Sequence, residues 1–151
     1  MKEYVLDANA VLRYFGVGEV HGGEKLRGLF EQAERNQASL SMSAITVGEV
    51  LYILLKYMDE QRASGYLQAL QNVVIVIDAD VKRTLEAATL KHRCKLAYAD
   101  SFAASLALAS RATLVSADPS FVKVGKSLKW MRLPELHVDR RETQRTRGAV
   151  P

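Results

Sequence analysis

Short apolar runs alternate along this chain with segments of helical period. Strands are predicted at residues 3–7, 39–42, 73–77, 112–115 and 129–133. Helices are predicted between them at about 8–15, 24–35, 43–57, 61–71, 80–92 and 98–110. The continuous β-branched run at 73–77 is typical of a strand buried on both faces. Strands separated by helices predict an α/β fold with a central, mainly parallel sheet and helices on both sides.

Local signals place several helix boundaries. Ser43 offers an N-cap for the helix that follows it, and Asp78 or Asp80 can cap the helix that ends near His92. Asp59 and Glu60 indicate an exposed helix start. Alanines at positions 103, 104 and 107 give the last long helix a small-residue face, which should let it approach the sheet closely.

Length and composition indicate one soluble globular domain. The chain has 151 residues, of which 48% are hydrophobic and 25% charged, so a disordered chain is excluded. The sequence has neither an apolar run of about 18 residues nor the apolar core of a signal peptide. We therefore expect a cytoplasmic protein without membrane association. We expect a folded domain over residues 1–135, followed by a flexible basic tail over 136–151.

The net charge of +4 is compatible with a polyanionic partner. Half of this excess lies in residues 138–151, which hold four arginines against one aspartate and one glutamate. A solvated terminus is the expected role of this segment, and a functional arm is the alternative. The single Cys94 cannot form an internal disulfide, and the three histidines lack ligand spacing. Any bound metal must therefore be held by oxygen.

Four acidic residues interrupt apolar segments where a core residue or a neutral cap would cost less free energy. Asp7 and Asp118 follow apolar runs at predicted strand ends, where parallel sheets form a ligand crevice. Glu49, with isoleucine at both i−4 and i+4, and Asp100 lie on helical stripes that should face the interior. Converging carboxylates raise each other's pKa unless a cation is present, and Mg²⁺ or Mn²⁺ prefers oxygen ligands. The four residues together predict a metal site.

Two polar residues are candidates for a supporting role at this site. Asn9 lies two residues after Asp7, and Ser116 lies two residues before Asp118. Each can orient a carboxylate or bind a metal-bound water, and each can equally be a cap or turn residue. Capping also explains each aspartate taken singly, since a carboxylate near a helix N-terminus, such as Asp100, is favoured by the helix dipole.

The spacing of four segments resembles a PIN domain, and within that family it is most similar to the VapC-type toxins of type II toxin–antitoxin pairs. The segments are Val5-Leu6-Asp7-Ala8-Asn9, Ser43 to Glu49, Ala99 to Ala104, and Leu114 to Phe121. The resemblance covers roughly residues 1 to 135. It implies a three-layer α/β/α fold whose acidic quartet maps onto Asp7, Glu49, Asp100 and Asp118. Some members carry a further acid where this chain has Ser120, so the number of metal ions stays open.

The resemblance implies a divalent-metal-dependent endoribonuclease with Mg²⁺ as cofactor and Mn²⁺ as an alternative. One ion would activate water for in-line attack on an RNA phosphodiester, leaving 5′-phosphate and 3′-hydroxyl ends. Asp7, Asp100 and Asp118 would be metal ligands, and Glu49 would bind metal or position the water. Affinity for phosphate would come from a basic rim, for which Arg13, Lys95 and the C-terminal arginines are candidates.

Expected partners are RNA, a cognate antitoxin that places a basic side chain among the carboxylates, and a second copy of the chain. Apolar residues of the helical region 24–71 should be mostly core, and part of them could form a dimer or antitoxin groove: Leu26, Leu29, Phe30, Leu51, Leu54, Leu55 and Leu67. The alternatives are a housekeeping RNA-processing nuclease and a non-catalytic RNA- or protein-binding PIN domain. A haloacid-dehalogenase phosphatase would want an aspartate in place of Asn9, and a receiver domain matches only loosely through Asp78 and Lys95.

Overall fold

A parallel β-sheet forms the centre of the molecule. The computed structural model describes residues 1–17 and 23–134, and five strands within these ranges pair in the order β3-β2-β1-β4-β5, each parallel to its neighbour. Their bounds are β1 (Lys2–Leu6), β2 (Ala38–Ser43), β3 (Val74–Ile77), β4 (Thr113–Ser116) and β5 (Trp130–Arg132). The expected tail over 136–151 lies outside the described residues.

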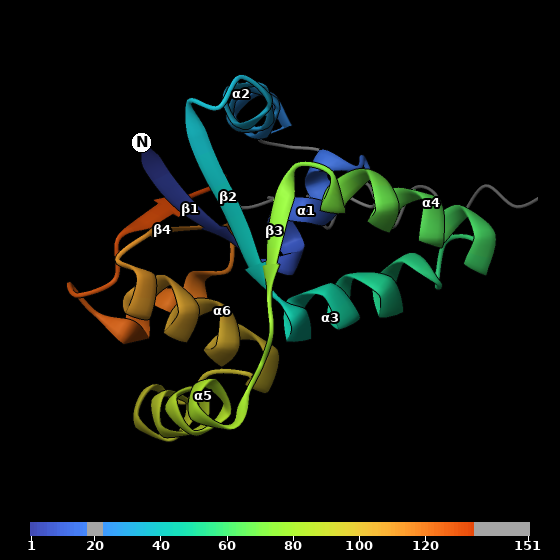
Figure 1. Ribbon diagram of the computed structural model, residues 1–151. Helices are drawn as coiled ribbons and strands as arrows, with labels where there is room; N and C mark the ends of the chain where they lie inside the picture. Colours follow the sequence, from blue (N-terminus) through green and yellow to red (C-terminus); the bar gives the residue numbers. More distant parts are fainter. Residues whose placement is uncertain (18–22, 135–151) are drawn as a thin grey trace, which may run out of the picture.

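Helices cover both faces of this sheet (Figure 1). One face carries α1 (Ala8–Tyr14), α2 (Gly23–Glu34), α3 (Ala44–Leu54) and α4 (Glu60–Gln71). The other carries α5 (Val81–Cys94), α6 (Tyr98–Ser110) and the 3₁₀ helix η1 (Pro119–Val124). The alternation of β1 divides the core, since Tyr4 and Leu6 join the first layer and Val5 joins the second. The three-layer α/β/α architecture is confirmed.

Side-chain caps set several of these boundaries as predicted. The Ser43 hydroxyl accepts a hydrogen bond from the Ile45 amide at 3.2 Å, and Asp80, at the N-cap of α5, accepts one from the Arg83 amide at 2.9 Å. Helix α3 ends at Leu54, three residues before the predicted end, and beyond it the Lys56 and Tyr57 amides bond at the tighter i−3 spacing. The 3₁₀ helix η1 was not predicted; Asp118 caps it and Pro119 opens it.

The prediction that residues 73–77 form a strand buried on both faces is wrong. β3 is an edge strand, in which Val74 is buried while Ile75 is 57% exposed. Helices α3 and α4 contact β3, whereas α6 packs on β1, β2 and β4, so the second helical layer leaves the far side of β3 open. A β-branched run therefore marked a strand correctly and its burial incorrectly.

The order of the strands creates a switch point beside β1. The chain moves outward from β1 to β2 and β3, then returns to place β4 on the other side of β1. In a parallel sheet, a crevice for ligands forms where the connections from two neighbouring strands run to opposite sides of the sheet. The crevice lies outside the carboxyl ends of those two strands. The Asp7 amide donates to the Val115 carbonyl at 3.1 Å and holds these two strand ends together.

Helix α6 approaches this part of the sheet closely, as its alanines predict. Ala103, Ala104 and Ala107 are fully or almost fully buried against the second core layer.

Among the helices of the described ranges, none has both the length and the hydrophobicity that a membrane-spanning segment requires.

Candidate metal centre

Three carboxylates from three different elements converge at the switch point. Asp7 follows β1 directly, Glu49 lies in the second turn of α3, and Asp100 lies in the first turn of α6. One ligand oxygen from each lies within 4.8 Å of the others. We call these residues the acidic trio. Carboxylates this close to one another form an arrangement that a hard divalent cation would stabilise.

Asp118 lies beside the acidic trio and has a second role. Its Oδ1 accepts a hydrogen bond from the Ser120 amide at 2.9 Å, so its side chain caps η1. The charge of Asp118 also raises the pKa of each member of the trio. The capping role and the proximity to the trio that the sequence suggested for this residue therefore coexist.

Glu49 occupies the border of the buried face of α3, not its centre as predicted. The fully buried stripe of this helix consists of Thr46, Val50 and Leu54, one position further along, and Glu49 is half-buried. This position lets the Glu49 carboxylate reach Asp7 and Asp100 without placing the whole side chain in the core. The Glu49 Oε2 is itself buried and has no hydrogen-bond partner among the described residues.

The trio is electrostatically strained as it stands. Burial raises the pKa of Asp7 to about 6, and the hydrogen bond from Ser116 opposes this rise. Burial, with the charges of Asp7, Asp118 and Glu49, raises the pKa of Asp100 to about 8. The pKa of Glu49 is also raised, by burial and then by the charge of Asp118. All three shifts disfavour the ionised form that a metal ion would require.

A hydrogen-bond network fixes the position of Asp7. Its side chain makes no capping hydrogen bond to α1, although the residue occupies the N-cap. Instead the Ser116 hydroxyl donates to Asp7 Oδ2 at 2.7 Å and accepts from the Asp118 amide at 3.1 Å. Asn9 Oδ1 accepts from the Ala117 amide at 3.0 Å. Ser116 thus contacts a carboxylate of the trio directly, whereas Asn9 orders the loop after β4.

Replacing Ser116 with alanine is expected to weaken divalent-metal binding by about tenfold. The variant loses the hydrogen bond that lowers the pKa of Asp7, and partners of metal ligands typically contribute 10- to 100-fold in affinity. Titration with Mg²⁺ or Mn²⁺ by calorimetry would measure the change. Ser110→Ala is the matched control, since the Ser110 hydroxyl bonds only its own helix at Leu106. Equal affinity in both variants would contradict this role.

Sequence reasoning assigned no role to Thr46. Its side chain is fully buried, and its hydroxyl has no hydrogen-bond partner among the described residues. It lies three positions before Glu49 on α3, a spacing that places two side chains on neighbouring parts of a helix surface. The i, i+3 relation to Glu49 is the sequence signal that would have identified Thr46 as a neighbour of the site.

The three candidates for the predicted basic rim differ in where the structure places them. Arg13 is 8% exposed and donates from Nη1 to the Pro134 carbonyl at 2.6 Å, so its prediction as a rim residue is wrong. Arg13 is one of the buried residues of α1, and its hydrogen bond connects this helix to Pro134, the last described residue. Lys95 is exposed at the left-handed C-cap of α5 and remains a candidate. The C-terminal arginines lie outside the described residues.

The residues of this centre fit a hard divalent cation. The donors are carboxylate oxygens, as Mg²⁺ and Mn²⁺ prefer, and a metal ion would satisfy the orphaned Glu49 Oε2. Asp7, Glu49 and Asp100 would hold it. Asp118, which already caps η1, is a candidate fourth ligand.

Fold and site together define an α/β/α protein with an acidic centre at the carboxyl edge of a parallel sheet. The chain belongs to the PIN domain family, whose model matches residues 4–127. This match spans all four acidic positions predicted from the sequence. No curated protein matches the chain in sequence.

Solved structures with the same fold come from several bacteria. VapBC2 from Rickettsia felis, bound to a promoter DNA fragment, aligns with a TM-score of 0.70 at 20% identity, covering 87% of this chain and 99% of that one. VapBC-1 from nontypeable Haemophilus influenzae aligns at 0.65 and 19%, covering 86% and 97%. Mycobacterium tuberculosis VapC20, described as a toxin that cleaves the sarcin-ricin loop, aligns at 0.63 and 15%, covering 83% and 98%. At identities of 15–20%, these structural alignments show a shared fold alone.

Proposed function

We propose that this chain is a divalent-metal-dependent endoribonuclease and the toxin of a toxin–antitoxin pair. The convergence of the acidic trio at the switch point of the sheet is the observation that carries the proposal. Membership of the PIN family and the fold shared with VapBC proteins support it. VapC20, with the same fold, is described as cleaving an RNA loop, which supports RNA as the substrate class.

The protein's own residues would hold the ion and orient the reactants. Asp7, Glu49 and Asp100 provide ligand oxygens, while Ser116 keeps one oxygen of Asp7 hydrogen-bonded and fixes its orientation. Glu49 has a free buried oxygen, which can accept a proton or a hydrogen bond from an attacking water. A bound Mg²⁺ would supply Lewis-acid stabilisation of charge on the phosphate oxygens.

The electrostatics of the trio also support an inhibitory protein partner. Burial, and then the charges of the neighbouring carboxylates, raises the pKa values of Asp7 and Asp100, and a metal ion or an inserted lysine or arginine side chain would favour their ionised form. We therefore propose that an antitoxin inhibits the protein by placing such a side chain among the carboxylates. Cytoplasmic location and a homodimer remain predictions alongside this one.

The purified protein is expected to cleave RNA with Mg²⁺ or Mn²⁺ and to lose activity in EDTA. Product ends should be 5′-phosphate and 3′-hydroxyl, because a metal-activated water attacks the phosphodiester in line. Gel analysis of structured RNAs, followed by end-labelling, would test both points. Full cleavage in EDTA, or products with cyclic phosphate ends, would refute the proposed chemistry. Small phosphoesters serve as the control for phosphatase activity.

A further inference from the structure

A row of three side chains on α3 leads away from the acidic trio. Glu49, a member of the trio, is followed by Tyr52 and Lys56 at i+3 and i+7, positions that lie on the same side of a helix. We call these three residues the α3 ridge. Figure 1 shows α3 beginning at the carboxyl end of β2 and running out beyond the sheet. The ridge therefore extends the metal centre along the protein surface for about 10 Å.

Tyr52 presents an aromatic ring to solvent one turn from the metal centre. The residue is 64% exposed, and the Nζ of the exposed Lys56 lies over its ring, 4.5 Å from the centroid. Side chains on a helix lean towards its N-terminus, so the Tyr52 ring leans towards Glu49 and the Lys56 side chain leans back over the ring. Positive charge and an aromatic surface are thus held together beside the carboxylates.

Gly48 leaves the helix surface in front of this ring bare. It is exposed and lies four residues before Tyr52, on the side of the ring away from Lys56. A Cβ added at Gly48 would lie more than 4 Å from every surrounding side chain outside its immediate chain neighbours. Glycine is less favourable in a helix interior than any residue except proline, and packing among the described residues does not demand it here. The open space gives a flat ligand access to the Tyr52 ring.

An exposed ring beside a cation is the combination with which proteins bind single-stranded nucleic acid. Bases of any identity stack on the ring, and the cation attracts the phosphate backbone. Because the α3 ridge starts at Glu49, a strand whose phosphodiester reaches the trio can pass directly over Tyr52 and Lys56. Bases inside a duplex are stacked on their neighbours, so only an unpaired base can offer its face to the ring.

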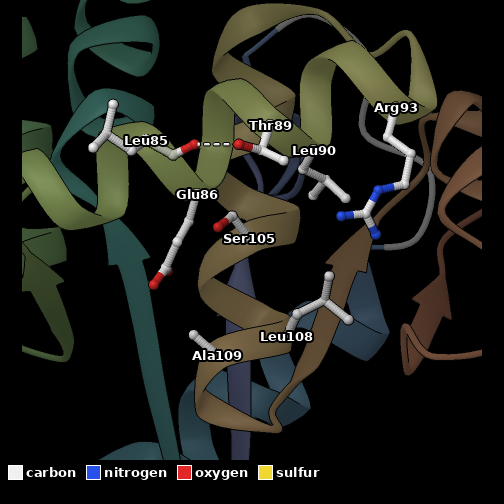
Figure 2. Close-up of a pocket in the computed structure, with 8 residues that line it drawn as sticks. All are labelled: Leu85, Glu86, Thr89, Leu90, Arg93, Ser105, Leu108 and Ala109. Carbon is white, nitrogen blue, oxygen red and sulfur yellow. Dashed lines mark hydrogen bonds between the residues drawn. The ribbon is translucent and has the colours of Figure 1, made fainter.

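A surface hollow between α5 and α6 lacks this combination. It has a volume of about 550 Å³, and Figure 2 shows that the side chains lining it include the charged Glu86 and Arg93 but no aromatic ring. None of the lining residues belongs to the acidic trio. A nucleotide bound there would have no ring on which to stack and no contact with the carboxylates.

We propose that the α3 ridge is a nucleotide subsite, in which an unpaired RNA base stacks on Tyr52 and a phosphate of the same strand binds Lys56. This inference rests on the proposed ribonuclease function and specifies its substrate as RNA that is unpaired next to the cleaved bond. Tyr52 and Lys56 act by positioning the strand, and the carboxylates carry the chemistry.

Binding of a labelled RNA tests the proposal without cleavage. The full chain carrying Asp7→Asn would be titrated by fluorescence anisotropy into an RNA of about ten nucleotides, either single-stranded or annealed to its complement. The single strand should bind at least about tenfold more tightly than the duplex. A 2-aminopurine base in the single strand should lose fluorescence on binding, because stacking on Tyr52 quenches it.

Four variants in this background separate the ring from its surroundings. Tyr52→Ala should weaken single-strand binding by about tenfold or more and restore the 2-aminopurine fluorescence, whereas Tyr52→Phe keeps the ring and should bind within about twofold of the parent. Gly48→Leu fills the open space, so it should weaken binding as Tyr52→Ala does while raising Tm. Lys56→Gln should reduce the slope of log K against log salt by about 0.7, as expected for one lost phosphate contact.

Matched controls lie away from the ridge. Tyr57→Ala removes a tyrosine that is 62% exposed five positions beyond Tyr52, and Lys2→Gln removes a positive charge at the amino end of β1, about 16 Å from Asp7. Both should leave the affinity within about twofold of the parent, and circular dichroism would confirm that every variant is folded.

Unchanged binding by Tyr52→Ala and Gly48→Leu, or equal affinity for single strand and duplex, would overturn the proposal and leave the ridge to a protein partner. Loss of binding in Tyr52→Phe equal to that in Tyr52→Ala would also overturn it, because the hydroxyl and not the ring would then make the contact. Cleavage by the wild type without stacking contradicts this inference alone. Stacking without cleavage by the wild type contradicts the nuclease proposal and leaves the RNA subsite in place.

Discussion

Replacement of Asp7 by asparagine is expected to reduce metal-dependent RNA cleavage by at least about a thousandfold. The carboxylate is 3% exposed, and one of its oxygens belongs to the acidic trio. Loss of a charged ligand removes several kcal/mol of charge stabilisation around the reacting phosphate, and each 1.4 kcal/mol corresponds to about tenfold in rate. Single-turnover cleavage of a structured RNA at saturating Mg²⁺ would measure the effect.

The same variant should fold at least as well as the wild type without metal. Asparagine has nearly the shape of aspartate and can still accept the Ser116 hydrogen bond, while the buried charge is gone. Asp80→Asn is the matched control, because asparagine caps a helix about as well as aspartate and Asp80 lies at the start of α5. Wild-type turnover in purified Asp7→Asn protein would exclude Asp7 from catalysis and weaken the nuclease proposal.

The metal-free protein is expected to lose stability as pH rises from about 4 to about 8. The unfolded value for an aspartate is 3.8, whereas the folded pKa is about 6 for Asp7 and about 8 for Asp100. Between these values the folded state binds more protons than the unfolded state, so the free energy of unfolding falls with increasing pH. Saturating Mg²⁺ should restore stability, and its effect on Tm should be larger at pH 8 than at pH 5.

Variants isolate the part of this pH dependence that the site causes. Asp100→Asn removes the group with the higher raised pKa and should flatten the decline in Tm between about pH 6 and 8. Glu60→Gln removes an exposed carboxylate in the first turn of α4 and should leave the decline intact. Thermal melts in EDTA across this range provide the measurement. An unchanged slope in Asp100→Asn would show that the trio does not dominate the pH response.

Local patterns predicted the elements well because they depend on neighbouring residues. Ser43 and Asp80 cap their helices through hydrogen bonds that span two or three residues, and sequence alone exposes such relations. The burial of β3 and of Arg13 depends on where distant elements pack. Ile75 is exposed because α6 covers other strands, and Arg13 is buried with its guanidinium bonded to the Pro134 carbonyl, 121 residues away.

The candidate site shows the same division. The sequence predicted the positions of Asp7, Asp100 and Asp118 at strand ends and at a helix start, where the structure has them. It placed Glu49 one position too deep on α3, because a single apolar stripe does not reveal which of two adjacent stripes faces the core. The closeness of three carboxylates depends on the order of the strands, which the alternation of elements does not specify.

The acidic trio draws its members from positions 7, 49 and 100, with the supporting hydroxyl at 116. During synthesis, therefore, no emerging fragment of the chain contains the whole centre until most of the domain has been made. Helix α6 and strand β4 must be made and docked on β1 before the carboxylates meet. Contacts between such distant positions form late, because closing long loops costs entropy that only the nearly complete fold recovers. The proposed activity would therefore become possible only after residues 7 to 116 have all been made and packed together.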